Sequence, residues 1–221
     1  MDKRQQHYCH ALGIQPWQRR SSSQKETAEE MPHWDRLEQA VKQCMACSLH
    51  QTRTQTVFGV GNREAKLMII GEAPGFYEDQ QGQPFVGRAG QLLNRMLKAI
   101  GMEREQVYIA NILKCRPPNN RDPLPEEVQT CTPFLDQQIA LIQPRLLLAV
   151  GRIAAHYLLK TKSSLESLRN KQHHYGLAQT PLIITYHPAY LLRNPADKKK
   201  AFVDLQFVQR VILNKPNIAS S

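Results

Sequence analysis

The chain has 221 residues, of which 41% are hydrophobic, and its formal net charge at pH 7 is +10. This length accommodates one compact domain with appendages, or at most two small domains. No apolar run approaches the roughly 18 residues of a membrane-spanning helix, and the N-terminus lacks the continuous apolar stretch of a signal peptide. We therefore expect a cytoplasmic protein whose basic charge serves either a nucleic-acid partner or an ordinary solvated surface.

The first part of the chain has the composition of an appendage. Residues 18–32 read QRRSSSQKETAEEMP, a polar and serine-rich stretch that is typical of a flexible linker. Residues 8–20 hold a short apolar island that is too short to fold alone and is either disordered or a docking peptide. We expect residues 1–32 to be an extension, residues 33–215 to be one domain, and residues 216–221 to be a disordered tail.

The rest of the chain alternates between two kinds of segment. Runs with the length of buried strands occupy residues 66–71, 107–111, 145–151 and 181–188. Stretches with the apolar periodicity of helices occupy residues 33–44, 89–101, 125–143, 153–159 and 198–213. Buried strands that alternate with helices predict a layered α/β fold with a mostly parallel, four-stranded central sheet.

Chemically interesting residues follow three of the predicted strands. The segment 71–75 follows the first strand, Asn111 ends the second, and His187 comes at the end of the fourth. In parallel sheets, ligands bind beyond the carboxyl ends of the strands. We therefore expect a binding site at that edge, close to the glycine-rich and acidic segment 71–93.

Four of the five cysteines have the spacing of a metal site. Cys44 and Cys47 form a C-x2-C pair, and Cys115 and Cys131 follow far downstream, whereas Cys9 stands alone. Four thiolates can hold either zinc or a 4Fe–4S cluster, and spacing does not separate the two. Four unrelated buried cysteines are the alternative, and disulfides are less favoured in a reducing cytosol.

Several motifs in a fixed order resemble one family. They are RTQTVFGVGN, GEAPG, GQPFVGRAGQLL, NILKCRPP and HPAYLLRNP, which together with the four cysteines extend over about residues 40 to 213. This pattern resembles the family 4 uracil-DNA glycosylases. The resemblance implies a three-layer α/β/α fold, removal of uracil from DNA, a monomer in the bacterial cytosol or nucleoid, and a 4Fe–4S cluster rather than zinc on Cys44, Cys47, Cys115 and Cys131.

The resemblance assigns three residues to the uracil itself. An enzyme that acts on a base flips it out of the duplex, and Phe85 would stack on the flipped ring. The Asn111 amide would bind uracil through both its NH2 and its C=O group, and would leave these groups unpaired with cytosine. His187 would donate to the O2 atom as the uracil leaves with negative charge. Alternatively, Phe85 is an ordinary core residue, Asn111 caps the end of the strand, and His187 is a structural histidine.

The resemblance also includes a departure from other uracil glycosylases, because Ala73 lines the site where they carry an aspartate. Glu72 is then the candidate for stabilising the sugar cation and activating water, and Asn120 is a candidate for positioning that water. Glu72 could instead organise the loop. Glu78 would lie near the C5 edge of uracil and exclude the methyl group of thymine.

The segment after His187 resembles a wedge loop. Leu191 and Leu192 would fill the gap that a flipped nucleotide leaves, although both could be core residues. Asn170 stands where family members commonly have glycine. Since asparagine tolerates left-handed dihedral angles, we expect the turn there to persist.

The apolar island, which reads YCHALGIQPWQRR, resembles the N-terminal peptide of the psi subunit of the bacterial clamp loader. It predicts docking to a clamp-loader or other replisome subunit through residues 8–20. The alternative to the enzyme is therefore a glycosylase-like module that binds DNA or the replisome with weak or no activity. A zinc-dependent nucleic-acid-binding protein is a third hypothesis.

Overall fold

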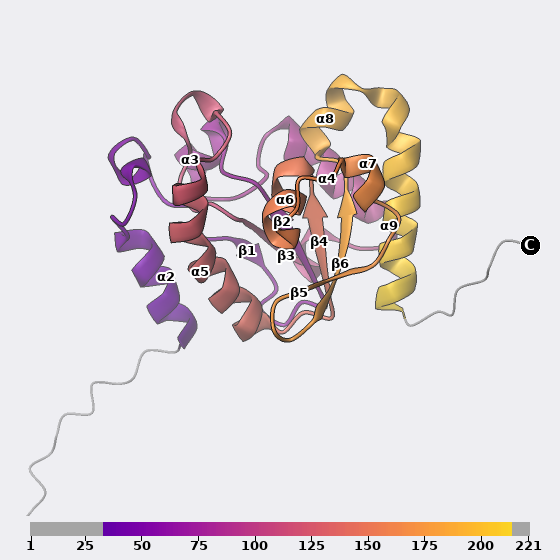
Figure 1. The fold of residues 1–221 in the computed structure, drawn as a ribbon, viewed down its shortest axis with the longest axis horizontal. Helices are drawn as coiled ribbons and strands as arrows, with labels where there is room; N and C mark the ends of the chain where they lie inside the picture. The colour runs from indigo at the N-terminus through magenta and orange to yellow at the C-terminus, as the bar shows by residue number, and fades with distance from the viewer. Residues whose placement is uncertain (1–32, 214–221) are drawn as a thin grey trace, which may run out of the picture. The chain divides into compact units, whose positions relative to one another are not determined.

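A computed structural model gives the fold of the chain and describes residues 33–213 (Figure 1). The predictions made for residues 1–32 and 216–221, including the docking peptide at 8–20, lie outside the described residues. Within residues 33–213, no helix is both long and apolar enough to cross a membrane.

A mixed sheet runs through the centre of the domain. Its order is β1-β3-β2-β4-β6-β5. The strands are β1 (Val60–Gly61), β2 (Leu67–Gly71), β3 (Tyr108–Asn111), β4 (Leu146–Val150), β5 (His173–Tyr175) and β6 (Thr180–Thr185). The inner four are parallel, as predicted, whereas β1 and β5 pair antiparallel at the two edges. The sequence did not predict these edge strands, because each is only two or three residues long and neither is apolar.

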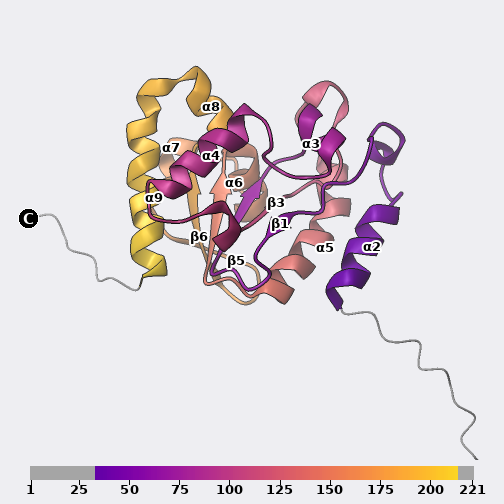
Figure 2. The ribbon, with the colours of Figure 1, turned by 180° about the vertical axis from the view of Figure 1, so that it is seen from behind.

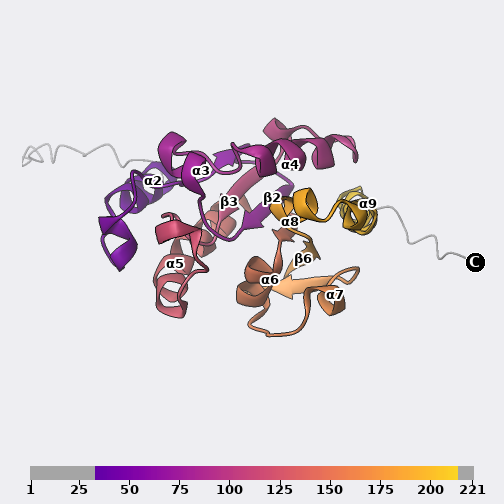
Figure 3. The ribbon, with the colours of Figure 1, turned by 90° about the horizontal axis from the view of Figure 1, so that it is seen from above.

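Helices cover both faces of the sheet. They are α2 (His33–Gln43), α3 (Phe76–Gln81), α4 (Arg88–Lys98), α5 (Pro125–Ile142), α6 (Arg152–Leu159), α7 (Leu165–Leu168), α8 (Pro188–Arg193) and α9 (Lys198–Ile212). Short 3-10 turns are η1 (Ser48–Gln51), η2 (Arg104–Gln106), η3 (Pro118–Asn120) and η4 (Pro195–Asp197). Seen from above, α5, α6 and α7 lie on one side of the strands, and α4 and α9 lie on the other (Figure 3).

The alternation of side chains along β2 explains the three layers. Met68 and Ile70 belong to a core shared with α2, α5 and α6, whereas Leu67 and Ile69 belong to a core shared with α4 and α9. All five residues of β2 are buried because both faces of the sheet are covered. The predicted three-layer α/β/α architecture is confirmed.

The carboxyl ends of the parallel strands share one edge of the molecule. The β4 and β6 arrows point toward the end where α3 and α8 lie (Figure 1), and from behind α4 crosses the sheet beside α9 (Figure 2). Asn170 is left-handed, with φ of 54°, so the turn predicted to survive the loss of glycine is present. The fold thus gathers the loops after β2, β3, β4 and β6 around a single site.

Candidate active site and cysteine cavity

Gly71 is the point where two of the predicted uracil-binding residues, Asn111 and Phe85, converge. It pairs with Asn111 across β2 and β3. A Cβ atom added to Gly71 would lie 2.3 Å from Asn111 Oδ1 and 2.8 Å from Phe85 Cζ. Only glycine leaves room for both side chains here, so the strand end is built around the amide and the ring.

Asn111 carries an unusual polar atom. The residue is 2% exposed, and its Oδ1 is buried without a hydrogen-bond partner among the described residues. An unpaired buried acceptor costs about 1–3 kcal/mol, so proteins rarely retain one without a use. The atom is therefore a candidate acceptor for a ligand.

Phe85 is held in a strained backbone conformation. Its φ is 53°, and its ring centroid lies 5.6 Å from that of His187 at an interplanar angle of 32°. Arg104 donates from Nη1 to the Phe85 carbonyl (3.3 Å) and from Nη2 to the Pro84 carbonyl (2.6 Å). Arg104 is not among the residues predicted from sequence, because a single arginine in a short 3-10 turn has no motif that marks it.

His187 is a neutral hydrogen-bond donor. Its Nδ1 accepts the Ala189 backbone N–H at 3.1 Å, so the single proton of the neutral ring resides on Nε2. Desolvation of the ring, together with the positive charge of Arg193, lowers the pKa of His187 to about 4. The Cβ atom of His187 would lie 2.9 Å from a Cβ atom on Gly151, whose φ is 100°, so the β4–α6 turn packs directly under the histidine.

Glu72 has the opposite pKa shift. Burial, and then the negative charge of Asp122, raise the pKa of Glu72 to about 7, and Arg152 opposes them. Arg152 and Asp122 form an exposed ion pair at 3.6 Å. At neutral pH, Glu72 is therefore poised between its acid and carboxylate forms, as suits a group that handles protons.

Other predicted site residues are Glu78, Asn120 and Ala73. Glu78 is partly buried, and its Oε2 would be 2.7 Å from a Cβ atom on Gly75. Asn120 is exposed and left-handed, with φ of 52°, and its Oδ1 accepts from Arg116 Nε at 2.7 Å. Ala73 packs against the core cluster and offers no polar atom. Phe85, Asn111 and His187 thus lie together, and Asn120 lies on η3, where it contacts Arg116.

The predicted wedge residues differ in exposure. Leu191 is 1% exposed and belongs to the core on the α4 and α9 side of the sheet, whereas Leu192 is only partly buried. A wedge needs a side chain that can reach the duplex. In this conformation, Leu192 is the one of the two that has surface free.

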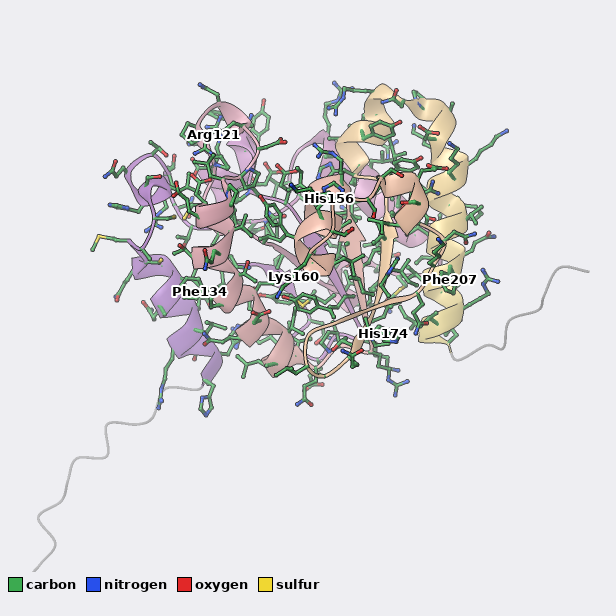
Figure 4. The ribbon with its side chains drawn as sticks, in the orientation of Figure 1. Arg121, Phe134, His156, Lys160, His174 and Phe207 are labelled. Carbon is green, nitrogen blue, oxygen red and sulfur yellow. The ribbon has the colours of Figure 1, made fainter. Side chains whose placement is uncertain are left out.

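All four predicted cysteines line one small cavity. They are free thiols, and the cavity is completed by Arg53, Lys114 and Phe134, among others. Figure 4 shows Phe134 on the side of α5 that faces α2. Arg53 Nη1 donates to Cys115 Sγ (3.1 Å), and the Lys114 backbone N–H donates to Cys131 Sγ (3.3 Å). Burial raises the pKa of Cys131 to about 11, so this sulfur needs a further positive partner to be a thiolate.

Two kinds of metal group come into question for the cavity. Within residues 33–213, no group of three or more His, Cys, Asp or Glu side chains is arranged to hold a metal ion. Thiolates around one zinc ion lie about 4 Å apart, since Zn–S bonds are about 2.3 Å long. The four thiols line one cavity and offer only sulfur as a ligand, a set that both zinc and an iron–sulfur cluster accept.

Comparison with known proteins defines the family. The uracil DNA glycosylase superfamily matches residues 58–207. A type-4 uracil-DNA glycosylase of Sulfurisphaera tokodaii is 40% identical over 83% of this chain and 86% of that protein. The chain belongs to the type-4 uracil-DNA glycosylase family. Type-4 enzymes of Archaeoglobus fulgidus (43% identical; 75% of this chain, 86% of that protein) and Thermotoga maritima (44%; 76% and 87%) are similar to it as well.

The family match covers the pocket completely. The superfamily region includes every pocket residue from Glu72 to His187, together with Cys115 and Cys131, but it begins after Cys44 and Cys47. The resemblance to family 4 stated from the motifs is confirmed. The comparisons do not show the resemblance of the N-terminal peptide to the clamp-loader psi subunit.

Proposed function

We propose that this protein is a DNA-repair glycosylase that flips uracil out of DNA and hydrolyses its N-glycosidic bond, leaving an abasic site. Membership of the type-4 family and the names of its relatives support this function. The observation that supports this function most strongly is the unpaired Oδ1 of Asn111 beside Phe85. A pure binding module has no use for such an atom.

The Asn111 amide matches one edge of uracil. Its Oδ1 accepts the N3–H group, and its Nδ2 donates to O4. Cytosine carries an acceptor at N3 and a donor at N4. The Oδ1 acceptor of Asn111 would then face an acceptor, and its Nδ2 donor would face a donor. A site built to pair with one base rejects the other strongly, because its own buried polar groups are then left unsatisfied.

Bond breaking separates charge between base and sugar. The Nε2–H of neutral His187 donates to uracil O2, where negative charge develops as the bond lengthens. Glu72, in its carboxylate form, stabilises the sugar cation and accepts a proton from the attacking water. Asn120 retains its side-chain NH2 group for that water, since its Oδ1 is bound to Arg116. Glu78 closes the pocket against the methyl group of thymine.

The cysteine cavity is proposed to hold a 4Fe–4S cluster on Cys44, Cys47, Cys115 and Cys131. When bound, the cluster supplies a structural cross-link between three separate segments of the chain. Arg53 and the Lys114 backbone N–H already point at two of the sulfurs, as donors to cluster ligands do. Leu192 is proposed to enter the gap in the duplex, in place of the buried Leu191.

Two further proposals rest on the sequence alone. The protein acts as a monomer in the bacterial cytosol or nucleoid, and residues 8–20 dock to a clamp-loader or other replisome subunit. A synthetic peptide of residues 1–30 should bind an isolated clamp-loader subunit, and the absence of binding at micromolar peptide would reject the docking.

The function is tested with wild-type protein and labelled oligonucleotides that carry a single uracil, cytosine or thymine. Alkaline cleavage should reveal abasic sites only in the uracil oligonucleotide. A brown protein with absorbance near 400 nm should accompany this activity. Intact cluster without uracil removal would instead support the glycosylase-like binding module, and a colourless zinc protein would support the zinc hypothesis.

A further inference from the structure

Two aromatic side chains stand in solvent at the start of α3. Phe76 is 50% exposed and Tyr77 is 61% exposed, and their rings meet edge to face with centroids 5.5 Å apart. The Tyr77 hydroxyl has no hydrogen-bond partner within residues 33–213. Paired exposed aromatic rings are costly to keep in water, and they mark binding surfaces more often than single ones.

An arginine completes this patch. The guanidinium carbon of Arg116 lies 5.0 Å from the centroid of the Phe76 ring, and its Nε donates to Asn120 Oδ1 at 2.7 Å. Arg116 is partly exposed and forms no ion pair with a carboxylate in the described part of the chain. Its charge is therefore held in place and remains available to an anion.

The patch borders the proposed uracil pocket. Glu78 follows Tyr77 directly, and its carboxylate lies between Gly75 and Gly87. A Cβ atom on Gly87 would touch the Tyr77 ring at 3.6 Å, and exposed Arg88 begins α4 at this point. On the other side, Arg116 donates to Asn120, the residue proposed to position water. The patch therefore adjoins the loop that carries Phe85.

Aromatic faces next to a cation are the chemistry that single-stranded nucleic acids require, because any base can stack and any phosphate can pair. We propose that Phe76, Tyr77 and Arg116 bind the nucleotide adjacent to the flipped uracil, with the rings against its base and the guanidinium on its phosphate. This site rests on the proposed function and specifies its substrate. In a duplex, neighbouring bases cover the face of this nucleotide, so the patch favours uracil in single-stranded DNA.

The test separates binding from chemistry by using uracil-free DNA. Fluorescence anisotropy of a short single-stranded oligonucleotide is measured with wild-type protein and with the Phe76→Ala/Tyr77→Ala double variant. The double variant should bind about 10- to 100-fold more weakly, whereas duplex binding should change about threefold or less. Arg116→Gln should reduce the slope of log affinity against log salt by about 0.7.

Matched variants distinguish the patch from a general surface effect. Tyr77→Phe retains the ring and should bind as wild type does, and Phe202→Ala removes a ring that is 41% exposed on α9 and should also bind normally. Equal single-strand affinity of the double variant and wild type would overturn the proposal, as would an equal loss on duplex. Because no uracil is present, these results stand whether or not the protein removes uracil.

Discussion

Glu72 and His187 have displaced pKa values for one shared reason, which is that burial disfavours the charged form of each group. For the histidine this gives a neutral donor at every pH above about 4. For the glutamate it gives a group that loses its charge near neutral pH. The same pocket thus holds a permanent hydrogen-bond donor and a switchable carboxylate.

The pH dependence of kcat/KM should report Glu72. Its pKa is raised to about 7, so the active carboxylate form is lost as pH falls through 7, and activity should fall on the acid side. Asp122→Asn removes a charge that raises this pKa and should move the acid limb to lower pH. Arg152→Gln should move it to higher pH. Two shifts in the same direction would contradict the assignment.

Arg104 should control the placement of Phe85. Arg104→Ala removes donors to the Pro84 and Phe85 carbonyls, so the left-handed Phe85 loses its support. Since hydrogen bonds to charged groups are worth about 1.5–3 kcal/mol, the inhibition constant of free uracil should rise about tenfold or more. Arg104→Lys retains the charge but only one donor group, so its inhibition constant should fall between those of wild type and Arg104→Ala. An unchanged inhibition constant for Arg104→Ala would show that Phe85 holds its place without the clamp.

That Phe85, Asn111 and His187 lie together followed from sequence, because two of them end predicted strands and the third is a lone ring among glycines; their roles stay predictions. Their partners were not predictable in this way. Arg104 reaches Phe85 from 19 residues away, and Asp122, before α5, and Arg152, at the start of α6, both act on Glu72. Leu191 looked identical to Leu192 in sequence, and only packing separates the buried side chain from the partly exposed one.

Helices α7 and α9 are joined to β6 by a buried ionic network. Arg169, directly after α7, binds Asp204 of α9 through Nε (2.8 Å) and Nη2 (3.1 Å), and Thr185 donates to the same carboxylate at 2.7 Å. The guanidinium also lies 4.2 Å from the Tyr186 ring centroid. This network fixes the end of β6, from which His187 and α8 project.

Breaking this network should destabilise the domain severely. Asp204→Ala leaves buried Arg169 with only the exposed Glu166 carboxylate at 3.0 Å, and loss of the buried partner costs about 3–5 kcal/mol of unfolding free energy. The Asp204→Ala/Arg169→Met double variant should lose less, because it leaves no buried arginine without Asp204. Chemical denaturation measures the unfolding free energies of both variants. A double variant less stable than Asp204→Ala would contradict an ionic origin of the destabilisation.

Among the secondary-structure elements, the four buried strands and the long helices followed from apolar length and periodicity. The edge strands β1 and β5 did not, because their pairing depends on neighbours that are distant in sequence. The 112–124 segment is likewise set by tertiary contacts. Arg121, labelled at the top of Figure 4, binds buried Glu127 at 2.6 Å and so ties the segment carrying Asn120 to α5.

The layers of the whole domain connect the cysteine cavity to the pocket. Lys114 lies between the two, with its backbone on Cys131 and its buried Nζ donating to the Asn111 carbonyl at 2.9 Å. Arg53, which donates to Cys115, is followed by Thr54, whose N–H binds Asp79 of α3 at 3.0 Å. The four cysteines were predictable as a set from spacing, but these two connections required the fold.

Loss of one cysteine should therefore affect the whole domain. Cys131→Ser should abolish most iron incorporation and the absorbance near 400 nm, and it should lower the melting temperature, because the proposed cross-link between the segment after α2, residue 115 and α5 is lost. Cys9→Ser serves as the matched control, since Cys9 stands apart from the four in sequence, and it should retain full iron content. Normal iron content in Cys131→Ser would remove this residue from the cluster.

The most direct test of uracil recognition is the single-turnover rate of base release from uracil and cytosine oligonucleotides. Wild-type protein and Leu177→Ala, a fully exposed control site, should release uracil at rates within about twofold of each other and should release no cytosine. Asn111→Ala removes the amide that reads N3–H and O4, and should slow uracil release by about 100-fold or more. An Asn111→Ala protein that releases uracil at the wild-type rate would contradict recognition through this amide.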